Sequence, residues 1–338
     1  MRPVVAIDAH KESCTYVVRH WNEHIAGPTR IPTTQEALRA LAAEYPDHDF
    51  VVEVCNVHEW MIDLFRGVGV HAMAVIPPKQ GPVGKKSDDD DATRIARKHQ
   101  AGELVEVYIA SPEIRAMRDL VRQHEFLKKK RTAFNNNLKH ALIRSNFQPR
   151  KLEGAGRAPG VYSPEGRAQV VERFPQLESV YAVIAVIDER MDGLKRQIQA
   201  KGKGIREVRL LRSVPGFGPI ISLALYTEIA EIDRFEKAER LVRYFGLDPV
   251  HGSSGDKHWD GHRISKKGVS FVRGVLAQGA WSHVTYCRES DITANYERLV
   301  TRGKTKQQAL MMVMRRLVKA VYWMLKEERE FTMNGPAR

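Results

Sequence analysis

The fold is decided by residues 3–10, PVVAIDAH, and by residues 14–21, CTYVVRHW. Both runs are rich in β-branched and other apolar residues, and the polar residues 11–13 separate them, which predicts a β-hairpin. Farther along the chain, the next apolar runs predict a helix, a buried strand, a helix ending on glycine and another strand. These elements are expected at residues 33–45, 50–55, 59–69 and 72–78. A hairpin followed by alternating units favours a mixed sheet covered by helices, as in the ribonuclease H architecture, over a purely parallel doubly wound sheet.

Two long helices are predicted after this α/β segment. Apolar residues recur at spacings of three and four from residue 111 to about 145 and again from Leu177 to Ile198, and the Gly- and Arg-rich residues 149–166 form a loop between them. The pattern fits an ordinary helical hairpin packed on its own domain, or an antiparallel coiled-coil arm that mediates dimerisation. The polar seam residues His124 and Arg131 favour the dimerisation arm, because polar seam positions specify pairing.

The remainder of the chain is expected to be helical, with a loop at residues 250–266 and a basic amphipathic helix within residues 305–328. The sequence therefore predicts an α/β segment followed by all-α segments. The expected boundaries are 1–108 for the ribonuclease H-like domain, 109–205 for the coiled-coil arm, 206–330 for the C-terminal domain and 331–338 for a frayed tail.

The charge balance indicates a polyanionic partner. The chain has 54 Lys and Arg against 41 Asp and Glu, a formal net charge of +13. Its three cysteines, Cys14, Cys55 and Cys287, are too scattered for a zinc site and odd in number, which is typical of a reducing cytoplasm. The N-terminal residues do not read as a signal peptide, and no apolar stretch approaches the roughly 20 residues of a membrane span. We therefore expect a cytoplasmic protein that does not associate with membranes.

Two carboxylates interrupt predicted strands. Asp8 and Glu53 each lie within an apolar run, where an uncompensated charge costs several kcal/mol. Either acid can be salt-bridged or face the edge of the sheet. Alternatively, carboxylates held on adjacent strands are what phosphoryl-transfer sites use to bind divalent metals.

A run of four aspartates extends this pattern. Residues 84–99 read GKKSDDDDATRIARKH, in which Ser87 can cap a helix with an acidic first turn. Capping is one explanation of these acids, but it does not explain the whole pattern. Asp88 and Asp91 lie on one helical face and can converge with the strand acids on a pair of Mg²⁺ or Mn²⁺ ions. Spacing alone leaves Asp89 as an alternative to Asp88.

Two glycine-rich segments are candidates for contacting nucleic acid. Residues 210–222, LLRSVPGFGPIIS, resemble a helix-hairpin-helix element. In such an element Gly216 and Gly218 permit a tight turn whose backbone N–H groups face a phosphate; a plain helical corner is the alternative.

The second glycine-rich segment is residues 245–276, in which a serine pair in a loop precedes several cations. Most loop serines only form turns, but neighbouring cations would neutralise an attacked phosphate. His258 and His262 are expected to contact phosphate or assist proton transfer. The predicted nucleic-acid-binding residues are Gly216, Gly218, Lys257, His262, Arg263, Lys266, Lys267 and Arg273.

These motifs together resemble the one-ten family of insertion-sequence transposases, which are related to the Piv-type DNA invertases and guided by a bridge RNA. The resemblance covers nearly the whole chain and rests on AIDAHK, VVEVC, KKSDDDDATRIA, SVPGFGPIIS, RYFGLDP, and SSG followed by RISKKG. It implies a RuvC-like ribonuclease H fold with a catalytic, metal-binding quartet at Asp8, Glu53, Asp88 and Asp91. It also implies that the catalytic serine is Ser254, with Ser253 less favoured.

The resemblance implies RNA-guided recombination of donor and target DNA through a phosphoserine intermediate, in the cytoplasm of a prokaryote. A structured non-coding guide RNA would pair with both DNAs, so base pairing would select the sequence. The serine of one subunit would act with the carboxylates of another, which requires a homo-oligomer: a dimer, and a tetramer on DNA. The competing hypotheses are a RuvC-like junction endonuclease with a metal-activated water, and a non-catalytic nucleic-acid scaffold. A covalent protein–DNA adduct separates the recombinase from the endonuclease. The scaffold predicts that replacing Asp8 or Ser254 changes nothing beyond stability, whereas the recombinase predicts lost strand exchange with folding and RNA binding retained.

Overall fold

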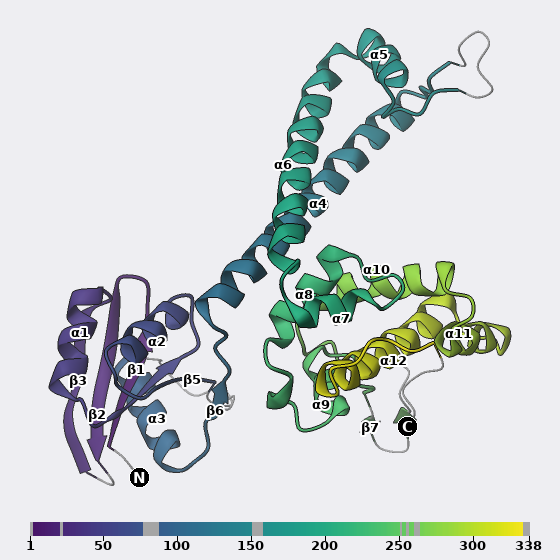
Figure 1. Cartoon of the computed structure of the whole chain (residues 1–338). Coiled ribbons are helices and arrows are strands. Elements are labelled where there is room, and N and C mark those ends of the chain that lie inside the picture. Colours follow the sequence, from purple (N-terminus) through teal and green to yellow (C-terminus); the bar gives the residue numbers. More distant parts are fainter. Residues whose placement is uncertain are drawn as a thin grey trace. The chain divides into compact units, whose positions relative to one another are not determined.

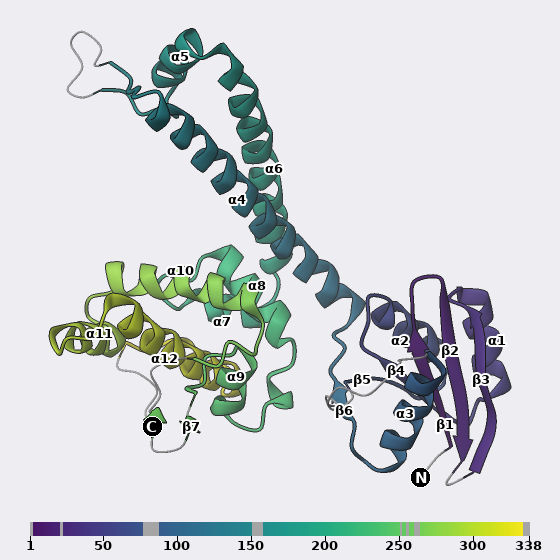
Figure 2. The same cartoon turned by 180° about the vertical axis from the view of Figure 1, so that it is seen from behind.

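The structure is a computed structural model of the 338-residue chain. It describes residues 3–20, 23–76, 88–150, 158–250, 252–254, 257–259 and 264–333. The chain divides into two compact units, Met1–Ala110 and Ser111–Arg338, each of which is described by itself (Figures 1 and 2).

The first unit is built on a six-stranded mixed sheet with the order β3-β2-β1-β4-β5-β6. The predicted hairpin is present as β1 and β2, which pair antiparallel, and β1 pairs parallel with β4. Strand β5 continues the parallel part, and β6 returns antiparallel. This mixed α/β layout confirms the predicted fold class at that level and is consistent with a ribonuclease H-like domain. The strands are β1 Val4–Ala9, β2 Ser13–His20, β3 Glu23–Pro32, β4 Asp49–Glu53, β5 Ala72–Ile76 and β6 Val105–Val107.

Helices cover both faces of this sheet. Alternate residues of a strand point to opposite faces, and in β1 the residues Val5 and Ile7 pack with helices α1 (Gln35–Glu44) and α2 (His58–Gly67). Val4 and Ala6 face the other side, where helix α3 (Asp88–Gln100) packs. Asp8 belongs to the same alternating set as Val4 and Ala6, so it lies on the α3 face.

The second unit begins with a long helical hairpin, the arm. Helices α4 (Pro112–Arg144) and α6 (Glu178–Gly202) run side by side in opposite directions, and α5 (Pro164–Arg173) and the 3-10 turn η1 (Pro175–Leu177) lie at the tip (Figures 1 and 2). The two long helices confirm the periodicity argument. Helix α5 begins at the end of the stretch expected to be a loop, where Ser163 caps its first turn.

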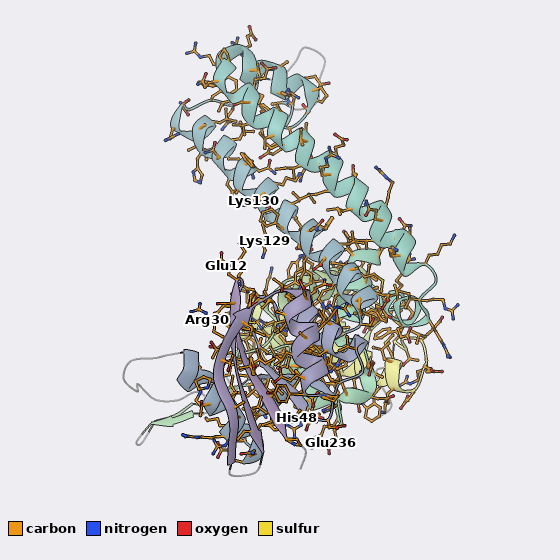
Figure 3. All side chains as sticks on the ribbon, turned by 90° about the vertical axis from the view of Figure 1, so that its left-hand side faces the viewer. Glu12, Arg30, His48, Lys129, Lys130 and Glu236 are labelled. Carbon is orange, nitrogen blue, oxygen red and sulfur yellow. The ribbon has the colours of Figure 1, made fainter. Side chains whose placement is uncertain are left out.

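The outer surface of the arm carries basic and apolar side chains. Lys129 and Lys130 are exposed on α4 (Figure 3), and the Lys130 ammonium lies 5.2 Å from the ring centre of Phe126, which is 58% exposed. Dimerisation through this arm stays a prediction, as does the separation of the arm from the C-terminal helices at residue 205.

The rest of the second unit is a helical domain around one core, in which Leu211, Leu225, Phe245, Leu276 and Leu317 are fully buried. The predicted amphipathic helix is α12, whose apolar stripe faces this core. The predicted loop at 250–266 contains a short β-hairpin, which the sequence did not reveal because three-residue strands show no periodicity. None of the described helices is long and apolar enough to cross a membrane. The elements are α7 Arg206–Arg212, α8 Pro219–Ile229, η2 Ile232–Arg234, α9 Ala238–Tyr244, β7 Gly252–Ser254, β8 Lys257–Trp259, α10 Ser270–Tyr286, α11 Asp291–Thr301 and α12 Lys306–Lys326.

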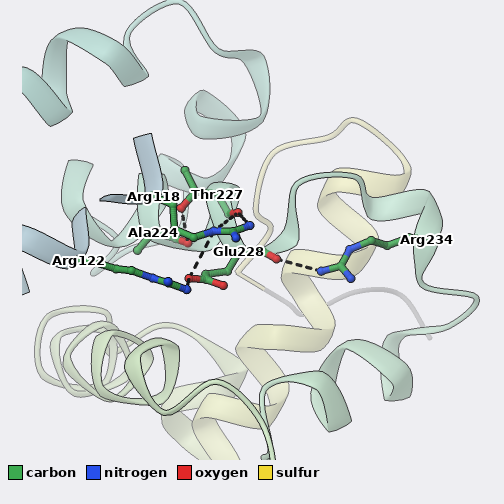
Figure 4. Close-up of polar contacts among 6 residues, drawn as sticks. All are labelled: Arg118, Arg122, Ala224, Thr227, Glu228 and Arg234. Carbon is green, nitrogen blue, oxygen red and sulfur yellow. Dashed lines mark hydrogen bonds and ion pairs between the residues drawn. The ribbon is translucent and has the colours of Figure 1, made fainter. Parts of the chain in front are cut away.

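A buried carboxylate joins the arm to this domain. Glu228 in α8 is 2% exposed, and its Oε1 lies 2.7 Å from Arg122 Nη2 and 3.7 Å from Arg118 Nε, both on α4 (Figure 4). Arg118 Nη2 also donates to the Thr227 carbonyl at 2.6 Å, and Arg234 Nη2 donates to the Glu228 carbonyl at 3.0 Å. The base of α4 is therefore tied to the end of α8 by charge-assisted hydrogen bonds.

Replacing Glu228 with glutamine is expected to destabilise this junction by about 3 kcal/mol, because the buried Arg118 would lose its counter-ion. Hydrogen exchange of the full chain should then show faster exchange of α4 and α8 amides. The matched control is Glu239→Gln, which removes a carboxylate that pairs with Lys319 at the surface and should change protection by less than about 1 kcal/mol. Equal protection in both variants would contradict the assigned role of Glu228.

Candidate active site

Asp8 and Glu53 lie at the carboxyl ends of neighbouring parallel strands. Ile7 of β1 pairs with Val52 of β4, so Asp8 and Glu53 each follow that pair by one residue and share the α3 face of the sheet. The Asp8 side chain is 13% exposed and that of Glu53 is 30% exposed. His10 Nε2 lies 3.5 Å from Asp8 Oδ2. The sheet thus positions two carboxylates side by side at one edge, partly open to solvent.

An arginine that the sequence reasoning missed, Arg94, links Asp91 to Glu53. Arg94 Nη2 lies 2.8 Å from Asp91 Oδ1 and 3.7 Å from Glu53 Oε2. One guanidinium therefore bridges a carboxylate of α3 and a carboxylate of β4. The available signal was the spacing, because Arg94 follows Asp91 by three residues and so lies on the same helical face.

The other aspartates are placed by their backbone alone. Helix α3 begins at Asp88, one turn before Asp91. The side chains of Asp88, Asp89 and Asp90 lie outside the described residues. The structure therefore does not distinguish Asp88 from Asp89 as the predicted metal ligand.

The donor set suits a hard divalent cation. Glu53 and Asp91 already converge on one cationic nitrogen, and carboxylate oxygens are the ligands that Mg²⁺ and Mn²⁺ prefer. Burial raises the pKa of the nearby Cys14 thiol to about 11, and burial also raises the pKa of Cys55, so neither supplies a thiolate at neutral pH. Among the described side chains no group of three His, Cys, Asp or Glu, including Asp8, Glu53 and Asp91, is placed to hold a metal ion. The fourth acid of the predicted quartet falls outside that set.

The serine pair lies on the short β7–β8 hairpin of the second unit. Ser253 pairs with His258 and Ser254 pairs with Lys257 across the two strands. An isolated bridge between Pro249 and Ile264 closes the root of the hairpin. The backbone therefore places the Ser254 position directly opposite a lysine, while the side chains of both strands lie outside the described residues.

Two grooves flank this root. One of about 900 Å³ is lined by Lys267, and one of about 610 Å³ is lined by Lys266; Pro249 contributes to both. Arg273, predicted to contact nucleic acid, donates from Nη1 to the carbonyls of Phe245 at 3.1 Å and Gly268 at 2.9 Å. Its guanidinium thus supports the turn that presents the two lysines. His262 and Arg263 lie outside the described residues.

The predicted hairpin turn between α7 and α8 is packed against α10. Gly216 has φ +95°, and a Cβ there would lie 2.7 Å from the Gly279 carbonyl oxygen and 2.8 Å from the His283 nitrogen. The buried His283 donates from Nδ1 to the Pro215 carbonyl at 2.8 Å, and its Nε2 lies 3.0 Å from Ser290 Oγ. Burial lowers the pKa of His283, so the ring is neutral and can serve as one donor and one acceptor.

Gly216→Ala is expected to destabilise the second unit by about 2 kcal/mol or more, since both the left-handed backbone and the contact with α10 oppose a side chain. Gly218→Ala is the matched control, because Gly218 has φ −77° and a Cβ there meets nothing within 4 Å. The melting temperature of each variant, read by circular dichroism, tests the difference. A Gly216→Ala protein as stable as the Gly218→Ala protein would refute this packing argument.

Comparison with known proteins returns two family models. A model described as Transposase, of the IS110 DEDD type, matches residues 5–146, which include Asp8, Glu53, Asp88 and Asp91. A model described as the Transposase IS116/IS110/IS902 family matches residues 208–297, which include the hairpin turn and the serine pair. The two matches thus cover both candidate regions.

Individual relatives agree with these models. The chain is 25% identical over 236 residues to a "Transposase for insertion sequence element IS1111A" of Coxiella burnetii, covering 68% of this chain and 64% of the relative. It is 27% identical over 278 residues to a "Probable family 20 transposase" of Pseudomonas aeruginosa, covering 80% of each. It is 30% identical over 122 residues to the "Pilin gene-inverting protein" of Moraxella bovis, covering 36% of this chain and 38% of the relative.

Proposed function

Because the chain belongs to the IS110 family of transposases, we propose that it cuts and rejoins DNA through a phosphoserine intermediate. Ser254 is the nucleophile in this proposal, and Asp8, Glu53, Asp88 and Asp91 hold Mg²⁺, or Mn²⁺ in its place. The observation that carries the proposal is the meeting of Asp8 and Glu53 on adjacent strands with Asp91 opposite them on α3.

The reaction exchanges one phosphodiester for another. Ser254 Oγ attacks a DNA phosphorus and forms a serine–phosphate bond as the 3′ oxygen leaves; the serine gives up its proton, and the leaving oxygen gains one. A divalent cation held by Asp8, Glu53, Asp88 and Asp91 would neutralise charge on the phosphate. The free 3′ hydroxyl of a new partner strand then reverses the link, so the energy of the ester is retained. Lys257, opposite Ser254, and the lysines at the hairpin root would attract the phosphate.

The proposal extends to partners. Donor and target DNA are the substrates, and the net charge of +13 suits binding of nucleic-acid backbones. We further propose that a structured guide RNA selects the DNA by base pairing. A homo-oligomer, a dimer that forms a tetramer on DNA, would bring the serine of one subunit to the carboxylates of another, in the cytoplasm of a prokaryote at the nucleoid. The relative of Moraxella bovis, named as a gene-inverting protein, supports DNA recombination as the reaction class.

The proposal is tested by mapping the covalent adduct. Purified full chain is incubated with Mg²⁺, RNA transcribed from the flanks of its gene and end-labelled element-junction DNA, and is then resolved on a denaturing gel. A nucleotide-modified peptide that contains Ser253 and Ser254, identified by mass spectrometry, is the expected result. Metal-dependent cleavage without any adduct would instead indicate a RuvC-like endonuclease, and binding without cleavage would indicate a scaffold.

A further inference from the structure

The 610 Å³ groove beside the serine hairpin has a lining of which the proposed chemistry uses only Lys266. It lies between α10, α12 and the root of the hairpin, where Pro249 and Ile264 form part of its wall. Its volume falls within the range of about 300–1,000 Å³ that is typical of small-ligand sites. The groove therefore shares wall residues with the root of the hairpin on which Ser254 lies.

Three cations on the rim of the groove have no ion pair with a residue that the structure describes. Lys266, Lys304 and Arg315 line it, and none of the three forms an ion pair with a described residue. Lys319 and Lys326 of α12, which do not line the groove, differ from these three, because Lys319 pairs with Glu239 and Lys326 pairs with Asp233. None of the described lining residues is acidic. Three cations that line one groove and have no counter-ion among the described side chains attract an anionic ligand.

The backbone fixes one of these cations. Lys266 is a non-glycine residue with φ +54°, and its N–H donates to the Gly246 carbonyl at 3.1 Å. A left-handed lysine costs about 1–3 kcal/mol and persists only where the surroundings impose it. The strained turn directs Lys266 to this groove and its neighbour Lys267 to the other one.

The floor of the groove is apolar and adaptable. Leu310, Met311 and Met312 line it, Met312 is 38% exposed, and Arg315 Nη1 lies 3.7 Å from Met312 Sδ. Methionine side chains are flexible and polarisable, so they pack against flat ligands of differing shape. A cationic guanidinium beside an apolar surface is also a stacking platform for a nucleobase.

From these features we propose that the groove binds one unpaired nucleotide of the DNA strand next to the phosphate that Ser254 attacks. The backbone phosphate contacts Lys266, Lys304 and Arg315, and the base lies on Met311 and Met312. Because the floor offers sulfur and methyl groups rather than a hydrogen-bonding pattern, binding tolerates any base. The placement beside the scissile phosphate rests on the proposed function, whereas nucleotide binding itself rests on the groove alone.

The experiment measures binding of a short fluorescent single-stranded DNA to the full chain by anisotropy, without metal. The double variant Lys304→Ala/Arg315→Ala is expected to bind about tenfold more weakly, with a shallower dependence on salt because fewer phosphate contacts remain. The control is Lys319→Ala/Lys326→Ala, which removes the same number of positive charges from α12 outside the groove and should bind like the wild type. Equal weakening in both doubles would show a bulk charge effect and overturn the proposal.

A second comparison tests the base. Met312→Ala, an exposed substitution, is expected to weaken binding about fivefold for an intact strand and not at all for a strand with abasic sites, since only the intact strand can use the floor. The same loss on both strands would refute base binding, and tighter binding of RNA of the same sequence would exclude DNA as the occupant. If these binding losses occur and no serine adduct forms, the groove stands and the proposed function fails.

Discussion

Ser254→Ala is expected to eliminate the covalent protein–DNA adduct and to reduce strand exchange by a factor on the order of 10³ or more, as expected for loss of a nucleophile. Alanine removes the attacking oxygen and leaves the β7–β8 backbone pairing intact. Binding of DNA and RNA should remain near the wild-type level, because the cations around the hairpin are unchanged. The measurement is the yield of adduct on a denaturing gel together with the yield of recombined DNA.

Ser253→Ala is the matched control for that variant. Neighbouring residues of a strand point to opposite faces, so only one member of the pair can present its hydroxyl to a given phosphate. Retention of the adduct in Ser253→Ala and its loss in Ser254→Ala would assign the nucleophile. The opposite pattern would move the assignment to Ser253, and an adduct in both variants would rule out this hairpin as the source of the nucleophile.

Asp8→Asn should lower metal-dependent cleavage by a factor on the order of 10² to 10³, with the fold retained. Asparagine keeps the size of the side chain but removes the charge that would hold a divalent cation, and the electrostatic contribution of one such group is of this magnitude. Cleavage and adduct yield are measured over a range of Mg²⁺ and Mn²⁺ concentrations. Chelation of the metal should reduce wild-type cleavage to the level of the variant.

The control for Asp8 is Asp47→Asn, an identical change at an exposed position between α1 and β4. It should leave cleavage unchanged. An active Asp8→Asn enzyme with ordinary metal dependence would mean that Asp8 has a structural role, consistent with its contact to His10.

The sequence predicted those features of the fold that leave a periodic trace. Two short β-branched runs separated by polar residues gave the hairpin of β1 and β2, and the three-and-four spacing gave α4 and α6. Strand β3 was missed because Gly27 and Pro28 interrupt it, which is tolerated only because it lies at the edge of the sheet. Strand β6 was missed because it is only three residues long.

The candidate site likewise has features that the sequence predicts and features that only the structure reveals. A charge within an apolar strand identified Asp8 and Glu53, yet their adjacency depends on the parallel register of β1 and β4, which links residues some 45 positions apart in the sequence. The bridging role of Arg94 and the unneutralised cations of the groove depend on side-chain contacts across elements, which a one-dimensional pattern does not encode. Resemblance to a family supplied the serine; no pattern of spacing distinguishes Ser254 from an ordinary turn residue.

The Glu228 cluster has a consequence for how such chains can be shuffled during evolution. Arg118 and Arg122 precede Glu228 by more than one hundred residues, and the outer arm and the loop at its tip lie between them in the sequence. A gene exchange that replaces only a segment between Arg122 and Glu228 keeps all three charges from one parent. An exchange with a single crossover between Arg122 and Glu228 takes the arginines from one parent and the glutamate from the other. Crossovers on both sides of the segment between Arg122 and Glu228 therefore leave the three charges of the junction from one parent.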